Sequence, residues 1–391
     1  MKKIVCIALT LFLFFGLPIA SFAENGINNG AEYNLGINEN ITISAKSAIL
    51  MDGTTGEILY EKNSDEALPP ASVTKVMTLL LVCEAMYGGN FTLDDTVTVS
   101  DYAASMGGSQ VFLREGEQIT VRDLLKSTVI ASGNDAAVAL AELTAGSESL
   151  FVAKMNEKAR EMELTGCSFE NVTGLDDTVT NHTMSAKDIA KISRELIKYP
   201  EITEYASIWQ DSIRGGEFTL TNTNRLVRYY SGCNGLKTGS TDKAGYCVSA
   251  TAKRDNMQLI SVIMGAESKD IRNTEAKTLL DYGFSSFYLY ESDECVLETA
   301  PVHFGKTTST PLIKESFCKI IKRSDVKNVE AIYGIPEFIS APAKRDEPIG
   351  EVVYKIGEYT LGKCNIYVES DIEKLDFLTL FATFVKSIVI G

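Results

Sequence analysis

The chain has 391 residues, of which 45% are hydrophobic and 23% are charged, and its net charge is −15. This length allows two domains with a sizeable core. The acidic balance argues against nucleic acid as a partner, because no excess of cations is available to neutralise phosphates. The sequence contains only two histidines, His182 and His303, so neither a Ser-His-Asp triad nor a histidine-based zinc site is expected.

Residues 1–23, MKKIVCIALTLFLFFGLPIASFA, have the features of a secretory signal peptide. Two lysines precede a short apolar run, and small residues stand near its end. The run is short for a bilayer span, which argues against a retained anchor. The mature protein is therefore expected to be secreted and to act outside the cytoplasm. Residues 24–40 are rich in Asn and Gly and are expected to form a flexible lead-in.

Residues 41–290 are expected to form one domain with an α+β fold. The segment SAILMDGTTGEILYEKN predicts a β-hairpin, and a buried helix follows from Ser72. Further helical segments come next. The segment GLKTGSTDKAGYCVSATAKRDNMQLISVIMGAE then predicts a strand, a turn and a strand, and NTEAKTLLDYGF predicts a helix. This order favours an antiparallel sheet flanked by helices.

The last hundred residues change in character. Residues 291–370 are rich in Val, Ile, Thr and Pro and are expected to form a smaller all-β domain. Residues 371–391 predict an amphipathic helix with Phe377, Phe381 and Phe384 on its apolar side. Its apolar run is too short to cross a bilayer, so we expect it to lie on a membrane surface. The alternative is a core helix packed on the β domain.

The start of the buried helix, PPASVTKVMTLLLV, raises a question about its lysine. Two prolines lead into the helix, and Ser72 is a favoured residue at such a position. Lys75 lies one turn further on the same face, where the helix enters the core. A buried ammonium is unfavourable unless the protein uses it. Ser72 and Lys75 are either a reactive pair or a capping serine beside a snorkelling lysine.

Two further motifs favour the reactive pair. Ser-x-x-Lys occurs four times in the chain, but Ser132-Gly133-Asn134 is its single Ser-x-Asn and Lys237-Thr238-Gly239 its single Lys-Thr-Gly. The first is expected on a loop between helices and the second at the start of a strand at the sheet edge. These three motifs in this order are typical of serine acyl enzymes that react with penicillin.

The sequence around the third motif, with LISVIMGAESKDIRNTEAKTLLDYGF, closely resembles the D-alanyl-D-alanine carboxypeptidases among the low-molecular-mass penicillin-binding proteins. The resemblance extends over nearly the whole mature chain. It implies a penicillin-binding, β-lactamase-like domain followed by a β-rich domain and a terminal membrane-associating helix. It also implies peptidoglycan stem peptides ending in D-Ala-D-Ala as substrates, β-lactams as inhibitors, and neither a metal nor a cofactor.

Each motif residue has a physical role in such a reaction. A serine hydroxyl needs a base within hydrogen-bond reach, and Lys75 can be that base if burial and a second cation, Lys237, lower its pKa. Ser132 can relay a proton to the leaving amine, and Asn134 can hold Lys75 and the substrate amide. The backbone N–H groups of Ser72 and of Ser240, just after the third motif, are expected to form an oxyanion hole.

The groups expected to bind substrate are Lys237, Thr238, Gly239, Ser240 and Arg272. Arg272 matches, by its offset from Lys237, an arginine of the family near this strand. Its alternative is an ordinary surface arginine in a salt bridge. Cys233 lies four residues before Lys237 and is expected to pack beside the sheet, because no histidine is predicted nearby to activate its thiol. No disulfide or zinc pattern is evident among the seven cysteines that follow the signal peptide.

Two other functions fit the motifs less well. A β-lactamase of class A carries a Glu-x-x-Leu-Asn segment between the second and third motifs, and this chain has none between Ser132 and Lys237. Fast hydrolysis of β-lactams is therefore disfavoured. A β-lactam sensor would carry a transmembrane helix and an intracellular domain, and neither is evident after Glu24.

Overall fold

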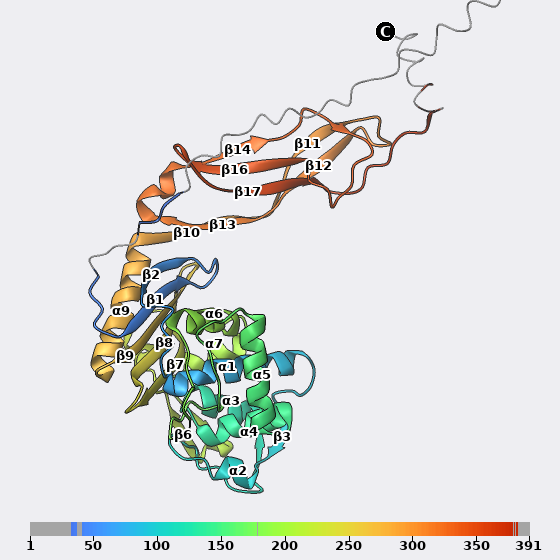
Figure 1. Ribbon diagram of the computed structural model, residues 1–391. Helices are drawn as coiled ribbons and strands as arrows, with labels where there is room; N and C mark the ends of the chain where they lie inside the picture. The colour runs from blue at the N-terminus through green and yellow to red at the C-terminus, as the bar shows by residue number, and fades with distance from the viewer. Residues whose placement is uncertain (1–32, 37–40, 178, 378, 380, 382–391) are drawn as a thin grey trace, which may run out of the picture. The chain divides into compact units, whose positions relative to one another are not determined.

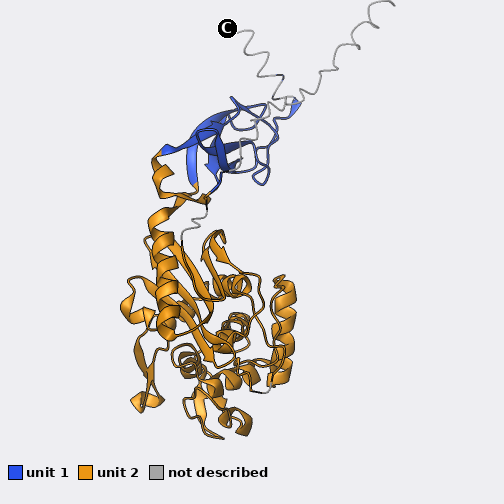
Figure 2. Cartoon of the chain, turned by 60° about the vertical axis from the view of Figure 1, so that its left-hand side comes forward, with its two compact units in different colours: residues 1–34, 295–315, 328–391 blue, residues 35–294, 316–327 orange. Residues whose placement is uncertain are grey.

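The computed structural model describes residues 33–36, 41–177, 179–377, 379 and 381 (Figure 1). The expected signal peptide and most of the lead-in lie outside the described residues. The chain divides into two compact units: residues 35–294 with 316–327 form the larger, and residues 1–34, 295–315 and 328–391 form the smaller (Figure 2).

The larger unit is built on a five-stranded antiparallel sheet with the strand order β2-β1-β9-β8-β7. The strands are β1 (Ser47–Asp52), β2 (Ile58–Lys62), β7 (Cys233–Thr241), β8 (Gly245–Arg254) and β9 (Met257–Ala266). The expected N-terminal hairpin is confirmed by the pairing of β1 with β2. The third motif lies on β7, at the sheet edge as predicted.

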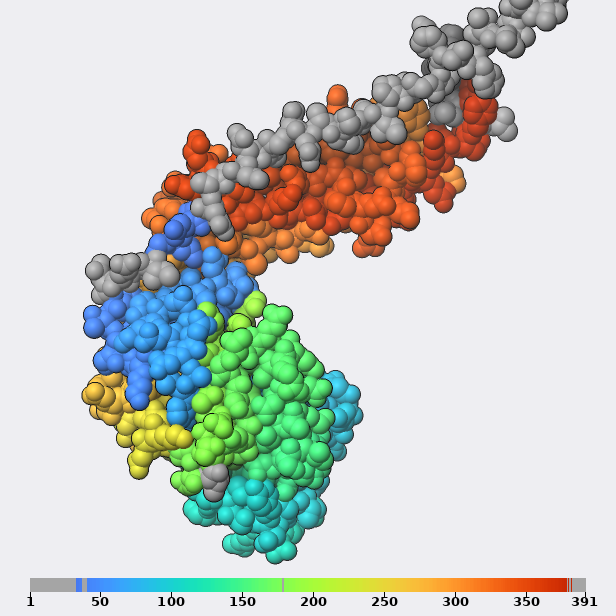
Figure 3. Space-filling view, viewed as in Figure 1, coloured from blue at the N-terminus to red at the C-terminus, as the bar shows by residue number. Residues whose placement is uncertain are grey.

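The helices of this unit cover both faces of the sheet. They are α1 (Lys75–Tyr87), α2 (Asp101–Ala104), α3 (Val121–Val129), α4 (Asn134–Ala145), α5 (Glu148–Glu161), α6 (Ala186–Leu196), α7 (Pro200–Ala206), α8 (Leu226–Tyr229) and α9 (Lys269–Ser286). Two-stranded antiparallel sheets pair β3 (Thr96–Thr98) with β4 (Gln118–Thr120), β5 (Gln210–Ile213) with β6 (Phe218–Thr221), and β10 (Phe287–Ser292) with β13 (Phe317–Lys322). In Figure 3 the residues coloured cyan to light green, which include helices α2 to α7, occupy the right-hand side and the bottom of this unit.

Alternation along β1 explains the two helical layers. Ile49 and Met51 belong to the apolar core that includes residues of α1, α4 and α6. Leu50 points to the opposite face, where a Cβ built on Gly283 of α9 would lie 3.0 Å from it. Helix α9 therefore covers one face and the remaining helical layer covers the other (Figure 1).

The element that carries Ser72 differs in detail from the prediction. Residues Ala71–Thr74 form a 3₁₀ turn, and the α-helix starts at Lys75 rather than at Ser72. Ala71, the first residue of the turn, has a left-handed backbone with φ 48°. Residues 75–83 are all buried, so the expected burial of this helix is confirmed.

The region of the third motif contains three strands where the sequence predicted two. The chain turns at residues 242–244 between β7 and β8, as well as at Asp255 and Asn256 between β8 and β9. Lys237 consequently lies in the middle of β7 and not at its start, because Cys233 already pairs with Ala252.

The smaller unit is β-rich, as expected. Its six-stranded sheet has the order β14-β16-β17-β12-β11-β15. The strands are β11 (Cys295–His303), β12 (Ser309–Lys314), β14 (Val329–Gly334), β15 (Ile339–Ser340), β16 (Gly350–Ile356) and β17 (Tyr359–Val368). A short 3₁₀ segment, η3 (Arg323–Asn328), precedes β14. Residues 316–327, which the sequence suggested for this domain, group with the larger unit because β13 pairs with β10.

The sequence predicted a helix from residue 371, and this start is wrong. Ile372 and Lys374 form β-bridges with Ala343 and Gly305, and Ile372 is buried against the sheet. Residues 377, 379 and 381 are helical, and most of the remaining expected helix lies outside the described residues. Within the described part of the chain, no single helix has the length and apolar character needed to span a bilayer, and only the bent pair α4 and α5, at 80°, meets both criteria together.

Candidate active site

Ser72 lies on a turn that two other segments of the same chain contact closely. Gly174 approaches so closely that a Cβ there would lie 1.8 Å from the carbonyl oxygen of Ala71. Gly239 of β7 also lies close to the turn, since its Cβ would lie 2.8 Å from the backbone nitrogen of Ser72. The glycine of the Lys-Thr-Gly motif is therefore required where the strand passes over the serine turn.

Lys75 is fully buried and hydrogen-bonded. Its Nζ lies 3.2 Å from the Ser72 hydroxyl, 2.6 Å from the Asn134 side-chain oxygen and 3.0 Å from the Thr173 carbonyl oxygen. Burial above all, with the charge of Lys237 as a second cause, holds the pKa of the Lys75 ammonium well below its usual range. The prediction of a buried lysine beside Ser72 is confirmed geometrically.

The second motif bridges α3 and α4, on the loop predicted for it. Ser132 is buried with φ 63°, and Asn134 is the first residue of α4. Asn134 donates from its side-chain nitrogen to the Gly107 carbonyl at 2.7 Å, which fixes its oxygen toward Lys75. Its own backbone N–H donates to Ser109. The position of the second motif thus depends on the loop between α2 and β4.

Lys237 faces Ser132 from β7. Its Nζ donates to the Ser132 hydroxyl at 2.8 Å and to the Thr238 carbonyl at 2.9 Å. Burial, and then the nearby charge of Arg272, lower the pKa of Lys237 to about 7. The Thr238 hydroxyl donates to Thr223 at 2.8 Å. The two lysines therefore meet the two serines within one buried cluster.

A groove of about 470 Å³ opens beside this cluster. Six of the predicted site residues line it: Ser72, Ser132, Thr238, Gly239, Ser240 and Arg272. Sequence reasoning missed the other lining residues, which are Ser109, Trp209, Thr221, Asn222, Thr223, Arg225 and Lys269. Among the described residues that line the groove, the charged side chains are Arg225, Lys269 and Arg272, all cationic, which suits an anionic substrate group.

Arg272 is a buried residue and not the exposed arginine that the sequence left as an alternative. Only 4% of its surface is exposed, and it donates to Asn273 Oδ1 at 3.0 Å and to the Cys247 carbonyl at 3.5 Å. Burial lowers its pKa to about 10. A guanidinium held in this way beside Lys237 adds to the positive potential of the groove.

Two other groups noted in the sequence have structural roles. Cys233 donates its thiol to the Gly235 carbonyl at 3.3 Å, and burial raises its pKa to about 11, so it is not a ready nucleophile. His182 is buried between Thr74, at 2.7 Å, and the backbone N–H of Glu170, at 3.0 Å. Because its Nδ1 accepts from Glu170, its Nε2 carries the proton and donates to Thr74.

Comparisons with known proteins agree with this geometry. The profile of the family described as D-alanyl-D-alanine carboxypeptidase matches residues 35–268, and that of the penicillin-binding protein 5 C-terminal domain matches residues 284–374. The chain is 40% identical to the D-alanyl-D-alanine carboxypeptidase DacF of Bacillus subtilis (strain 168), over 94% of this chain and 95% of the relative.

Two solved structures are also similar. Penicillin-binding protein 5 from Haemophilus influenzae has a TM-score of 0.75 and 32% identity, covering 87% of this chain and all of the other. Penicillin-binding protein D2 from Listeria monocytogenes, in its ampicillin-bound form, has a TM-score of 0.58 and 31% identity, covering 63% of this chain and 99% of the other. On the family match and the identity across nearly its full length, this chain belongs to the D-alanyl-D-alanine carboxypeptidase family and is a serine-type carboxypeptidase.

Proposed function

We propose that Ser72 is the residue acylated by D-Ala-D-Ala stem peptides and by β-lactams, and that Lys75 is its base. The observation that carries this proposal is the set of three groups around Lys75. A neutral amine has two N–H bonds and one lone pair. Asn134 Oδ1, at 2.6 Å, and the Thr173 carbonyl, at 3.0 Å, are fixed acceptors that use both N–H bonds. The lone pair is then left for the Ser72 hydroxyl at 3.2 Å, which becomes the donor.

The remaining roles follow from this proton transfer. Lys75 removes the proton of Ser72 as the oxygen attacks the carbonyl carbon of the penultimate D-alanine. Ser132, hydrogen-bonded to Lys237, supplies a proton to the leaving amine and is reprotonated from the lysine pair. The backbone N–H groups of Ser72 and Ser240 stabilise the developing oxyanion, and the tight passage of Gly239 over Ser72 supports their convergence. Water then releases the shortened peptide from Ser72.

We further propose that Lys237, Thr238 and Arg272 bind the terminal carboxylate of the substrate. Arg272 and Thr238 line the groove, Lys237 is buried next to Thr238, and the described lining residues include no carboxylate, which supports an anionic ligand. Charge-assisted hydrogen bonds to this carboxylate set the scissile bond one residue from the chain end. Replacing the carboxylate by an amide should lower kcat/KM by an amount that corresponds to about 2–3 kcal/mol of lost transition-state stabilisation, the contribution of hydrogen bonds to a charged group. Equal hydrolysis of acid and amide would contradict the clamp.

Mass spectrometry after penicillin exposure tests the nucleophile. Wild-type protein should gain one penicillin mass, located on the peptide that contains Ser72, and Ser72→Ala and Lys75→Ala should gain none. Ser324→Ala is the matched control, because Ser324 and Lys327 form another Ser-x-x-Lys pair, on the exposed side of segment η3. An adduct on Ser72→Ala would reject the assignment.

We also propose that the protein is secreted and attached to the outer face of the cytoplasmic membrane by its C-terminal end. Phe377 and Phe381 support this, since they are 77% and 57% exposed and their rings stack at 6.3 Å. Exposed aromatic side chains of this kind are suited to the membrane interface. Because Ile372 and Lys374 belong to the β unit, the test is a chain ending at Leu375. It should stay folded and move to the soluble fraction, whereas continued membrane association would point to another anchor.

A further inference from the structure

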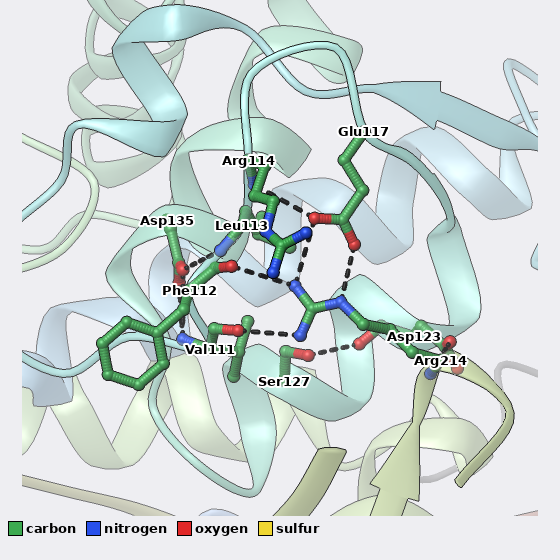
Figure 4. Close-up of polar contacts among 9 residues, drawn as sticks. All are labelled: Val111, Phe112, Leu113, Arg114, Glu117, Asp123, Ser127, Asp135 and Arg214. Atoms are coloured by element: carbon green, nitrogen blue, oxygen red, sulfur yellow. Dashed lines mark hydrogen bonds and ion pairs between the residues drawn. The ribbon is translucent and has the colours of Figure 1, made fainter. Parts of the chain in front are cut away.

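Arg214 lies outside the groove, yet it makes an unusually complete set of contacts. It occupies the short 3₁₀ turn η2 (Arg214–Gly216) between β5 and β6. Its guanidinium forms a bidentate ion pair with Glu117, at 2.6 and 3.2 Å. The same group donates to the carbonyls of Val111, at 2.9 Å, and Phe112, at 3.2 Å (Figure 4). Its backbone N–H donates to the carboxylate of Asp123. One side chain therefore binds a loop at three separate points.

The other side of this loop is held by Asp135. This carboxylate is 1% exposed and accepts hydrogen bonds from the backbone N–H groups of Val111, at 3.0 Å, and Leu113, at 3.1 Å. Figure 4 shows Val111, Phe112 and Leu113 between Asp135 and Arg214. Phe112 has φ 56°, which is unfavourable for a bulky residue and persists only where the surroundings impose it. The two charged groups impose it here.

This loop in turn positions the second motif. Gly107 and Ser109 of the same loop accept the side-chain and backbone N–H groups of Asn134, both at 2.7 Å. Asn134 accepts the hydrogen bond of Lys75, and Asp135 directly follows it. A shift of the loop would therefore move the acceptor that orients the Lys75 lone pair, without removing any residue that lines the groove beside Ser72.

We propose that Arg214 is a positioning residue for acylation: by clamping residues 107–117 it keeps Asn134 where it orients Lys75 toward Ser72. This inference rests on the roles proposed above for Ser72, Lys75 and Asn134. The clamp acts on the geometry of proton transfer, and Ser109 is the one described groove-lining residue within the clamped segment. Its loss should slow the acylation step more than it weakens the non-covalent binding of penicillin.

Rapid-mixing kinetics with a fluorescent penicillin separate these two quantities. Arg214→Gln should lower the acylation rate constant by roughly tenfold, as expected for a small misplacement of a catalytic group, and leave the dissociation constant of the first complex within twofold. Arg214→Lys keeps the positive charge but cannot make the bidentate hydrogen bonds of a guanidinium, so its acylation rate should lie between those of Arg214→Gln and the wild type. Arg122→Gln is the matched control, because Arg122 pairs with Asp94 at 2.7 Å and donates to Tyr205.

The outcomes separate this inference from the function on which it rests. If Lys75→Ala is inert while Arg214→Gln acylates at the wild-type rate, the inference is wrong and the proposed roles stand. If Lys75→Ala acylates normally, the proposed roles fail first. An equal loss in Arg122→Gln, or a loss in binding as large as that in rate, also rejects the positioning role. Should Arg214→Gln not fold, Glu117→Gln removes only its ion-pair partner and should show a smaller fall of the same kind.

Discussion

The substitution Gly174→Ala should disable the enzyme through the turn that carries Ser72. A Cβ on Gly174 would lie 1.8 Å from the carbonyl oxygen of Ala71 and 2.7 Å from Thr74 Oγ1. Real Cβ atoms essentially never come within 3.0 Å of such atoms, so the two segments must separate by about 1.2 Å, the difference between 3.0 and 1.8 Å. Thr173, whose carbonyl accepts from Lys75, would move with its neighbour. A displacement of this size in a catalytic group lowers rates by roughly 100-fold.

Gly89 provides a control with the same backbone. Gly174 and Gly89 have φ of +81° and +83°, so alanine at either position bears a similar conformational strain, about 1–2 kcal/mol. Nothing lies within 4 Å of a Cβ at Gly89. The strain is therefore shared by the two variants, and the clash belongs to Gly174 alone.

The two variants are compared by thermal unfolding and by the rate of acylation with penicillin at 25 °C. Gly89→Ala should lose a little stability and acylate at the wild-type rate. Gly174→Ala should lose more stability and acylate about 100-fold more slowly. If both variants acylate at the same rate, the contact between Gly174 and the serine turn does not govern reactivity, and the reasoning fails.

Three further predictions concern single groups. The pKa of Lys237, lowered to about 7, lies below that of an exposed lysine at 10.5, so the unfolded chain binds more protons between these values. The free energy of unfolding should rise across this window in wild-type protein and rise less steeply in Lys237→Met, as denaturant titrations would show. Burial lowers the pKa of His182 from 6.5 to about 4. The neutral imidazole therefore contributes fully to the free energy of unfolding above pH 6.5, and this contribution should be lost as the pH falls toward 4. His182→Gln should then unfold with a weaker pH dependence in that range, and an unchanged slope would contradict the burial argument. Cys233→Ser should keep wild-type acylation, measured with penicillin, because the thiol is protonated and bonded to Gly235.

The sequence predicted which motif side chains lie together better than it predicted the shape of the site. Ser72, Lys75, Ser132, Asn134 and Lys237 were found because each supplies a side-chain function at a fixed place in a motif, and the structure brings all five together. Thr173 could not be found in this way. Its contribution is a backbone carbonyl, which any residue could supply, and only the folded loop brings it to Lys75.

Arg225 and Lys269 were missed for another reason. Both line the groove, but one lies just before α8 and the other starts α9, and neither belongs to a motif. Asp135 was missed although it directly follows the Ser-x-Asn motif, because its partners are backbone N–H groups of a loop more than twenty residues earlier. The predicted helix boundaries were wrong at two places. Near Ser72 the left-handed backbone of Ala71 precedes a 3₁₀ turn, and after residue 371 two β-bridges replace the expected helix.

In the proposed mechanism, the two lysines give the negative charge of the substrate a role in activation. Lys75 and Lys237 are both buried, and the charge of Lys237 disfavours the charged form of Lys75. In that mechanism a carboxylate in the groove stabilises the ammonium of Lys237, whose neighbour Thr238 on β7 lines the groove. The charged Lys237, together with burial, then makes protonation of Lys75 less favourable, and the acceptors Asn134 and Thr173 orient the neutral amine. In the proposed mechanism, binding of the terminal carboxylate therefore does more than orient the scissile bond. It also selects the protonation state in which the Lys75 lone pair can accept the proton of Ser72, so that recognition and activation depend on one pair of charges.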